Sequence, residues 1–179
     1  MDLFKAIRER RSVRKFKREP VDDGDLKKIL EAGRLAPSGH NRQPWYFIVV
    51  RNSETKRELA VAANNQYFIG DADVVIAALG DPGEARLRLD ASLRRIPHKQ
   101  DPMIAIEHMV LAATALGYGT CWIGAFDEEE VKRILKVPER LTVVALLPVG
   151  VPDENPPPKP RKPFKEIFFR ESYGTPLEL

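Results

Sequence analysis

The sequence contains a single cysteine, Cys121, in 179 residues. One cysteine excludes an intramolecular disulfide and a paired-cysteine zinc site, and it favours a reducing compartment. No hydrophobic run reaches the roughly 18 residues of a membrane span, and residues 1–5 lack the hydrophobic segment of a signal peptide. We therefore expect a cytoplasmic protein that does not interact with a membrane.

A large surplus of charge of one sign is also absent. The 29 basic and 26 acidic residues leave a net charge of +3, so the chain does not require a nucleic-acid partner. The basic residues are instead concentrated locally, in residues 8–18. A hydrophobic fraction of 43% is enough for one domain with a buried core.

Metal and dinucleotide motifs are missing as well. The histidines lack metal-ligand spacing, so no metal is expected. His108 is expected to be a hydrogen-bonded core residue, and Cys121 a small buried hydrophobe. Gly117 and Gly119 do not start a dinucleotide fingerprint, because Trp122 stands where the third glycine belongs and the glycines follow a helix rather than a strand.

The hydrophobic pattern predicts alternating helices and strands. Asp22 and Asp127 are expected helix N-caps, with Glu130 completing a capping box. Pro102 is expected at the first position of a buried helix, where a proline loses no hydrogen bond. The expected helices are 2–11, 22–35, 55–63, 103–116 and one that Asp127 caps, and the expected strands are 45–50, 73–79, 120–123 and 142–149.

The composition changes after residue 151. Residues 152–163 contain six prolines, which neither a helix nor a sheet accommodates, so an extended arm is predicted. The apolar residues within 164–169 then need cover, either from the chain's own core or from a partner subunit. The chain thus divides into a core, residues 1–151, and a C-terminal arm, residues 152–179.

Two segments carry the candidate site. In residues 10–16, arginine guanidinium groups match phosphate oxygens, Ser12 adds a hydroxyl, and Val13 and Phe16 could anchor the segment to the core. A solvated basic face and a nucleic-acid contact are the alternatives. Residues 36–45 supply a hydroxyl, an amide and permissive backbone, although an ordinary helix-to-strand turn uses the same groups.

Four segments, in the same order along the chain, resemble the signatures of the flavin-dependent nitroreductase family. They are residues 10–16, 36–45, 116–124 and 159–163. The resemblance implies an α+β fold with a central mixed, mainly antiparallel sheet flanked by helices. It also implies an intertwined homodimer with FMN at the subunit interface, in which the arm docks on the partner subunit.

The resemblance further implies which residues hold FMN. Arg14 is expected to stabilise negative charge near N1 and O2 of the reduced flavin. Gln66 is a candidate for a ring contact within residues 64–100, a compressed region that often forms the substrate lid in the family. The implied FMN-binding residues are Arg10, Arg11, Ser12 and Arg14 for the phosphate, ribityl and pyrimidine end; Pro37, Ser38, Gly39 and Asn41 from the partner; Trp122, Ile123, Gly124 and Ala125 along the isoalloxazine; and Lys159 and Arg161 from the arm.

The function implied by this resemblance is that of an FMN-dependent oxidoreductase. NADH or NADPH would give a hydride to flavin N5 and leave, and a nitroaromatic, quinone or flavin acceptor would take its place, which is ping-pong turnover. The alternatives are a specialised flavoenzyme of the same fold (a dehydrogenase, dehalogenase or flavin-consuming synthase), a non-catalytic flavin-binding protein, and a nucleic-acid-binding module. The near-neutral remainder of the chain disfavours the last.

Overall fold

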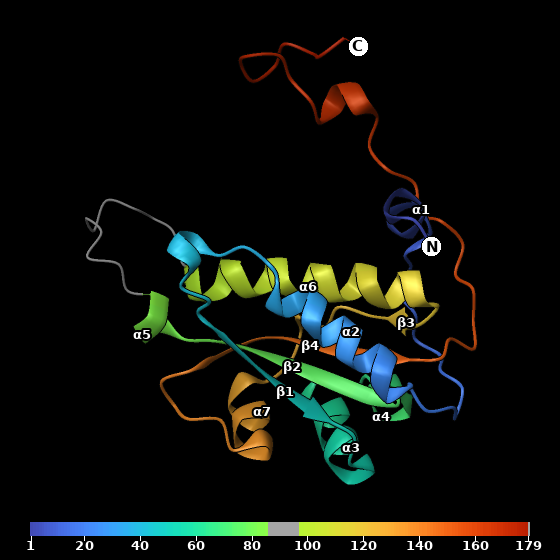
Figure 1. Cartoon of the computed structure of the whole chain (residues 1–179), viewed down its shortest axis with the longest axis vertical. Helices are drawn as coiled ribbons and strands as arrows, with labels where there is room; N and C mark the ends of the chain where they lie inside the picture. The colour runs from blue at the N-terminus through green and yellow to red at the C-terminus, as the bar shows by residue number, and fades with distance from the viewer. Residues whose placement is uncertain (86–96, 179) are drawn as a thin grey trace.

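A computed structural model describes residues 1–85 and 97–178 (Figure 1). The helices are α1 (Leu3–Glu9), α2 (Asp23–Arg34), α3 (Ser53–Ala62), α4 (Phe68–Asp71), α5 (Pro82–Ala85), α6 (Pro97–Leu116) and α7 (Glu128–Leu135), with short 3₁₀ turns at η1 (Gly39–Asn41) and η2 (Phe164–Glu166). The strands are β1 (Trp45–Val50), β2 (Val74–Gly80), β3 (Gly119–Thr120) and β4 (Thr142–Gly150).

The strands form one sheet in the order β1-β2-β4-β3. Every pair of named strands is antiparallel, with Trp45 opposite Gly80 and Val74 opposite Val149. A parallel backbone bridge joins Ser12 to Thr120 at the edge. The predicted α+β class with a mixed, mainly antiparallel sheet is therefore confirmed.

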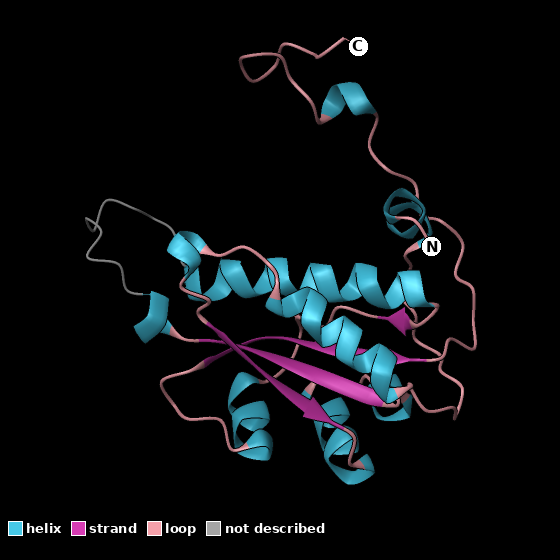
Figure 2. Cartoon of the chain, in the orientation of Figure 1, coloured by secondary structure: helices cyan, strands magenta, loops and turns pink. Residues whose placement is uncertain are grey.

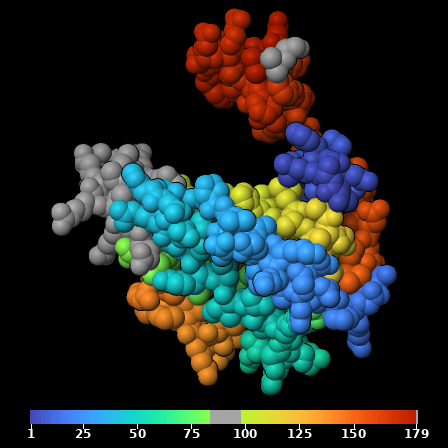
Figure 3. Space-filling model, in the orientation of Figure 1, coloured from blue at the N-terminus to red at the C-terminus, as the bar shows by residue number. Residues whose placement is uncertain are grey.

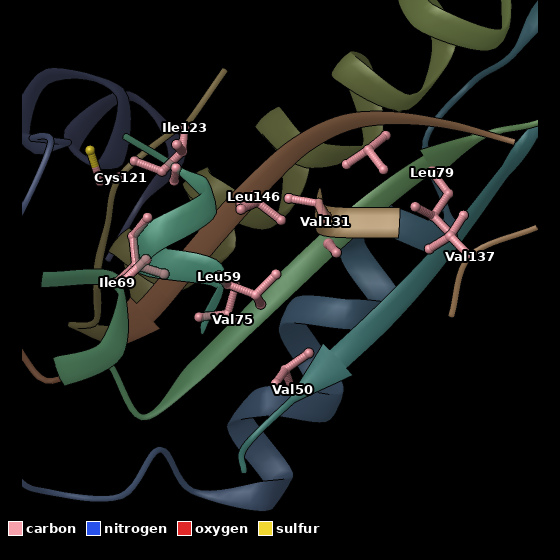
Figure 4. Close-up of a cluster of buried hydrophobic side chains, with 14 of the residues drawn as sticks. Val50, Leu59, Ile69, Val75, Leu79, Cys121, Ile123, Val131, Val137 and Leu146 are labelled. Carbon is pink, nitrogen blue, oxygen red and sulfur yellow. The ribbon is translucent and has the colours of Figure 1, made fainter. Parts of the chain in front are cut away.

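Helices cover both faces of the sheet (Figure 2). Helices α2 and α6 pack on one face around Ile29, Ile106 and Met109. Helices α3, α4 and α7 cover the other face (Figure 4), where Leu59 and Leu146 are fully buried. Because β2 lies inside the sheet and is covered on both faces, each of its residues is buried.

Helix α6 begins earlier than the sequence predicts. It starts at Pro97, so Pro102 lies inside the helix and not at its first position. Proline has no N–H for the carbonyl four residues before it, which here belongs to His98. That carbonyl oxygen lies 1.7 Å from where a Cβ on Gly80 would be. A glycine at the end of β2 therefore accommodates the start of α6, a non-local fit that the hydrophobic pattern does not reveal.

The two predicted N-caps are confirmed. Asp22 and Asp127 each accept a hydrogen bond from a backbone N–H in the first turn of the helix that follows. Only half of the predicted capping box forms: the N–H of Asp127 donates to the carbonyl of Ala62 at 2.8 Å, and the Glu130 carboxylate pairs with Arg133 at 2.8 Å. Leu35, predicted as part of the buried helix face, is 64% exposed because α2 has already ended at Arg34.

Two single-residue predictions about the core hold. Cys121 is buried, and the His108 ring lies 3.2 Å from the carbonyl oxygen of Ala32. No helix within residues 1–85 and 97–178 has the length and hydrophobicity needed to cross a membrane. Part of the predicted lid, residues 86–96, lies outside the described residues.

The last part of the arm stands apart from the body of the molecule (Figure 3). Its backbone hydrogen bonds to other described residues lie within it, and they include those from the N–H of Leu177 to the carbonyl of Phe168 and from the N–H of Arg170 to the carbonyl of Thr175. The rings of Phe164 and Phe168 stack with centroids 4.3 Å apart. Side chains that would normally form a core are half-exposed here.

Candidate functional site

The basic segment that follows α1 is fixed to the edge of the sheet. The N–H of Val13 donates to the carbonyl of Thr120 at 2.9 Å, and Val13 and Phe16 are buried. A Cβ on Gly119 would lie 2.9 Å from Val13, and one on Gly150 would lie 2.9 Å from Phe16. The apolar residues therefore anchor the segment, and the cations between them point outward.

The start of the arm runs beside this segment. The N–H of Lys17 donates to Val151, and the N–H of Asp153 donates to Lys15, each at 2.9 Å. The Lys15 ammonium also forms an ion pair with Asp153 at 2.9 Å, and this hydrogen bond raises the lysine pKa. These contacts bring the two ends of the chain together.

A cleft of about 430 Å³ lies where they meet, here called the cation cleft. Its described lining holds six cationic side chains and no carboxylate. Such a lining suits an anion with several oxygens, because guanidinium groups bind phosphate by charge-assisted hydrogen bonds. The lining residues are Ile7, Arg8, Arg10, Arg11, Ser12, Arg14, Pro156, Pro157, Pro158, Lys159 and Arg161.

The cations of the cleft are not equivalent. The Arg11 guanidinium donates to the carbonyls of Arg8 and Arg10 at 2.7 and 2.8 Å, so part of it caps the C-terminal end of α1. The Arg14 guanidinium lies 6.0 Å from the centre of the Phe68 ring and donates to the carbonyl of Ser12 at 3.4 Å. Arg14 therefore has an aromatic support beneath its charge.

A short segment after β3 continues from the cleft. The segment begins with Cys121, whose thiol interacts with residues of the cleft. Burial raises the pKa of this thiol, while Arg14, Ser12 and Arg10 oppose that shift. Trp122 is 39% exposed. Ile123 is buried and exchanges backbone hydrogen bonds of 3.0 Å with Leu146, so its side chain belongs to the core and only its backbone can face a ligand.

The predicted ring-contact residue lies beside this segment. The Gln66 amide nitrogen donates to the carbonyl of Ala125 at 3.3 Å and to that of Ala63 at 2.9 Å. Gly124 and Ala125 are exposed. The structure therefore brings Gln66 together with residues 122–125.

The turn at residues 37–41 lies elsewhere. The N–H of Gly39 donates to Asp101, near the start of α6, at 3.0 Å. The cation cleft lies at the other end of α6, where α1 and β3 are found (Figure 1), and where the N-terminal amine contacts the carbonyl of Ala115. At 1.5 Å per residue, about 20 Å of helix separates Asp101 from Ala115. One chain therefore does not bring Pro37, Ser38, Gly39 and Asn41 to the cleft.

This turn has an unusual backbone. His40, Asn41 and Gln43 have φ values of 52°, 53° and 51°, in the left-handed region that His and Asn adopt more readily than other non-glycine residues, so Gln43 is the least usual of the three. The Ser38 hydroxyl accepts from the N–H of Gln43 at 2.8 Å and helps to hold the turn. Strain that the surroundings maintain is often found at binding sites.

Three residues near the cleft are not among the predicted site residues. Arg8 belongs to the basic cluster of residues 8–18, and it lies one helical turn from Arg11. Phe68, beneath Arg14, and Glu154, whose carboxylate accepts from the N–H of Arg14, carry no local signal. Both reach the site through contacts between distant parts of the chain.

The structure is thus an α+β protein with a cleft whose described lining holds six cationic side chains. The sequence pattern described as Nitroreductase family matches residues 7–66 and 61–151. An NADH dehydrogenase from Thermus thermophilus is 32% identical over 196 residues, which cover 94% of this chain and 96% of the relative. The chain belongs to the nitroreductase family.

Solved structures agree with this assignment. A nitroreductase family protein from Clostridium novyi NT is 36% identical, with a TM-score of 0.81 over 98% of this chain and 97% of that chain. The NADPH:FMN oxidoreductase from Vibrio harveyi, solved with NAD+, is 28% identical, with a TM-score of 0.87 over 99% of this chain and 79% of that chain. The Vibrio enzyme is thus longer, whereas the Clostridium protein matches nearly end to end.

Proposed function

We propose that this protein is an FMN-dependent NAD(P)H oxidoreductase that reduces nitroaromatic, quinone or flavin-type acceptors. The observation that carries the proposal is the cation cleft, in which basic residues from opposite ends of the chain meet without a carboxylate in the described lining. Membership of the nitroreductase family and similarity to an NADPH:FMN oxidoreductase support the choice of FMN and a nicotinamide.

The residues present fit the phosphate end of FMN. Arg10, Ser12 and Arg161 would hold the phosphate, with Arg11 and Lys159 beside them. The exposed backbone of residues 122–125 would lie along the flavin ring, and Gln66 would border it. Gly124 is open to such a neighbour, since a Cβ there would meet nothing closer than 3.5 Å.

Bound FMN would supply hydride transfer, which no side chain of the protein provides. The chain's own part is to hold the ring, limit access of water and stabilise the charge that reduction places on the ring. Arg14 is the residue assigned to that charge, because Phe68 and the carbonyl of Ser12 keep its guanidinium beside the cleft. A positive charge held in advance stabilises a negative one without reorganisation.

We also propose that the working unit is a homodimer with its sites at the interface. Residues 37–41 lie at the far end of α6 from the cleft of their own chain, so a second copy would have to supply them. Two apolar surfaces are exposed in one chain: Leu3, Phe4 and Ile7 on α1, and Phe164, Ile167 and Phe168 on the arm. A partner subunit that receives the arm would cover such surfaces.

Anaerobic reduction tests the proposed function. Purified protein with bound FMN is mixed with NADH or NADPH, and the loss of flavin absorbance is followed. The reduced protein is then offered a nitroaromatic, a quinone and free flavin in turn. We expect one nicotinamide to bleach the flavin and an acceptor of these classes to restore it. Protein that neither retains FMN nor is reduced would contradict the proposal.

A further inference from the structure

A carboxylate stands at the edge of the most basic part of the molecule. Glu154 accepts a hydrogen bond from the backbone N–H of Arg14, and no Lys or Arg within the described residues forms an ion pair with it. A negative charge beside an anion site should weaken anion binding, although this one also interacts with Lys15, whose pKa it helps to raise. The position of Glu154 therefore needs another physical reason.

Backbone register supplies that reason. The two segments run antiparallel with Phe16 opposite Pro152, so the next residues along place Arg14 opposite Glu154. The backbone hydrogen bonds join Lys17 to Val151 and Asp153 to Lys15, so Arg14 and Glu154 form a non-hydrogen-bonded pair and the register gives the Arg14 N–H no carbonyl on the arm. The side-chain carboxylate of Glu154 accepts from that N–H. This contact ties the arm to residue 14 just before its proline run begins, and so fixes the direction in which the arm continues.

The direction in which the arm continues decides where its cations lie. Pro156, Pro157 and Pro158 follow after Asn155 and line the cleft. A proline-rich segment is stiff and has little freedom to change course. The contact between Glu154 and Arg14 therefore determines whether Lys159 and Arg161 reach the cleft.

We propose that Glu154 is a positioning residue that strengthens phosphate binding despite its charge, by tying the arm to the N–H of Arg14 and so directing Lys159 and Arg161 into the cation cleft. This inference rests on the proposed FMN site. The change in FMN affinity that it predicts for removal of the carboxylate is opposite in sign to the change that charge repulsion alone predicts. The two explanations can therefore be told apart by measurement. Removing the carboxylate should weaken the binding of FMN, not tighten it.

The test compares three variants of the full chain. Glu154→Ala removes the charge and the hydrogen-bond acceptor, and Glu154→Gln removes the charge but keeps an acceptor oxygen. Asp153→Ala is the matched control, since it removes a neighbouring negative charge whose side chain pairs with exposed Lys15. Dissociation constants are measured for FMN and for riboflavin, which lacks the phosphate. Hydrogen exchange at the Arg14 amide is measured without flavin.

We expect Glu154→Ala to weaken FMN binding about tenfold, which is equivalent to the loss of one charge-assisted contact. Riboflavin binding should be unchanged in this variant, and the Arg14 amide should exchange faster. Glu154→Gln and Asp153→Ala should bind FMN at least as tightly as the parent. The inference about Glu154 would be wrong if Glu154→Ala bound FMN as tightly as the parent or more tightly, if Asp153→Ala weakened binding equally, or if exchange at Arg14 did not change. Each of these outcomes would leave the proposed FMN site standing. A parent that does not prefer FMN to riboflavin would overturn the proposed site as well.

Discussion

The covered sheet and the C-terminal arm differ in how far their hydrophobic side chains are buried. In the sheet and the helices packed on it, Ile69 and Leu146 are fully buried. In the arm, Phe164 is 50% exposed and Tyr173 is 93% exposed, and α1 likewise leaves Phe4 70% exposed. The sheet and its helices therefore bury their apolar residues within one chain, whereas α1 and the end of the arm have apolar surfaces that one chain leaves open.

The arm itself has two parts. Its first part, from Pro152 to Arg161, is held at Asp153 and Glu154 against the segment 14–17 and lines the cation cleft. In its second part, from Pro163 on, the described backbone hydrogen bonds join residues of that part alone. The difference fits the proposal that the first part serves the site of its own chain and the second part serves association.

Removing the whole arm should have the largest effect. A chain that ends after Val151 loses the cations of the arm and its apolar segment together. We expect aggregation, monomers or loss of flavin, because exposed apolar surface on α1 and half of the phosphate site would remain. Size-exclusion chromatography and the flavin spectrum measure both properties.

A second truncation separates the two parts of the arm. A chain that ends after Pro163 keeps Lys159 and Arg161 but lacks the apolar segment. It should lose the dimer while the phosphate residues of each subunit stay in place. A chain cut after Val151 that stays dimeric and yellow would contradict the role given to the arm.

A matched pair of substitutions compares the two regions directly. Leu146→Ala removes a fully buried side chain from the core, and large-to-small changes of this kind destabilise by about 2–5 kcal/mol. Phe168→Ala removes a half-exposed side chain from the arm, so it should raise the dissociation constant of the dimer and affect the folding of each subunit little. Urea unfolding and a dilution series measure the two quantities. A large loss of folding stability in the Phe168 variant would show that the arm belongs to the core.

Local patterns predicted the fold well where neighbours in the sequence decide the structure. Asp22 and Asp127 cap their helices, and Gly117, with a φ of 93°, ends α6 as expected. The failures are non-local. The start of α6 depends on the fit of His98 against Gly80. The burial of Lys56, for which the sequence pattern predicts nothing, is non-local as well: its ammonium donates to the carbonyls of Ala72 and Asp73, and burial lowers its pKa.

The candidate site shows the same limit. Arg10, Ser12 and Arg161 were predictable from charge and motif, and the structure places them in one cleft. The different contacts of the individual arginines were not predictable, because the capping contacts of Arg11 depend on where α1 ends. The contacts of Arg14 with Phe68 and Glu154 could not be predicted either, because these two residues are distant from Arg14 in the sequence.

The next prediction sharpens the contrast between the two sides of the cleft. Arg10→Ala removes a cation next to α1, and Arg161→Ala removes one from the arm. Each should weaken FMN binding by roughly 1.5–3 kcal/mol, or about one to two decades in affinity, if both contact the phosphate. Equilibrium titration with FMN measures the change. If both variants keep the parental affinity, the assignment of this cleft to the phosphate is wrong.

The smallest expected effect concerns Arg14, which we assign to the flavin ring and not to the phosphate. Arg14→Gln keeps a hydrogen-bond donor but removes the charge, so the reduced flavin should lose stabilisation and its midpoint potential should fall. For a two-electron couple, a loss of about 1–2 kcal/mol corresponds to a shift of about 20–40 mV. Reduction by the nicotinamide should slow accordingly, while Arg10 and Arg161 keep FMN bound.

Redox titration of this variant against the parent separates the two possible roles of Arg14. A cation that only contributes to a solvated basic face would leave the potential of the bound flavin where it was. A cation held on Phe68 at 6.0 Å and directed at the ring would lower that potential when it is removed, without a matching loss of FMN affinity. An unchanged or raised potential at full flavin occupancy would falsify the role assigned to Arg14.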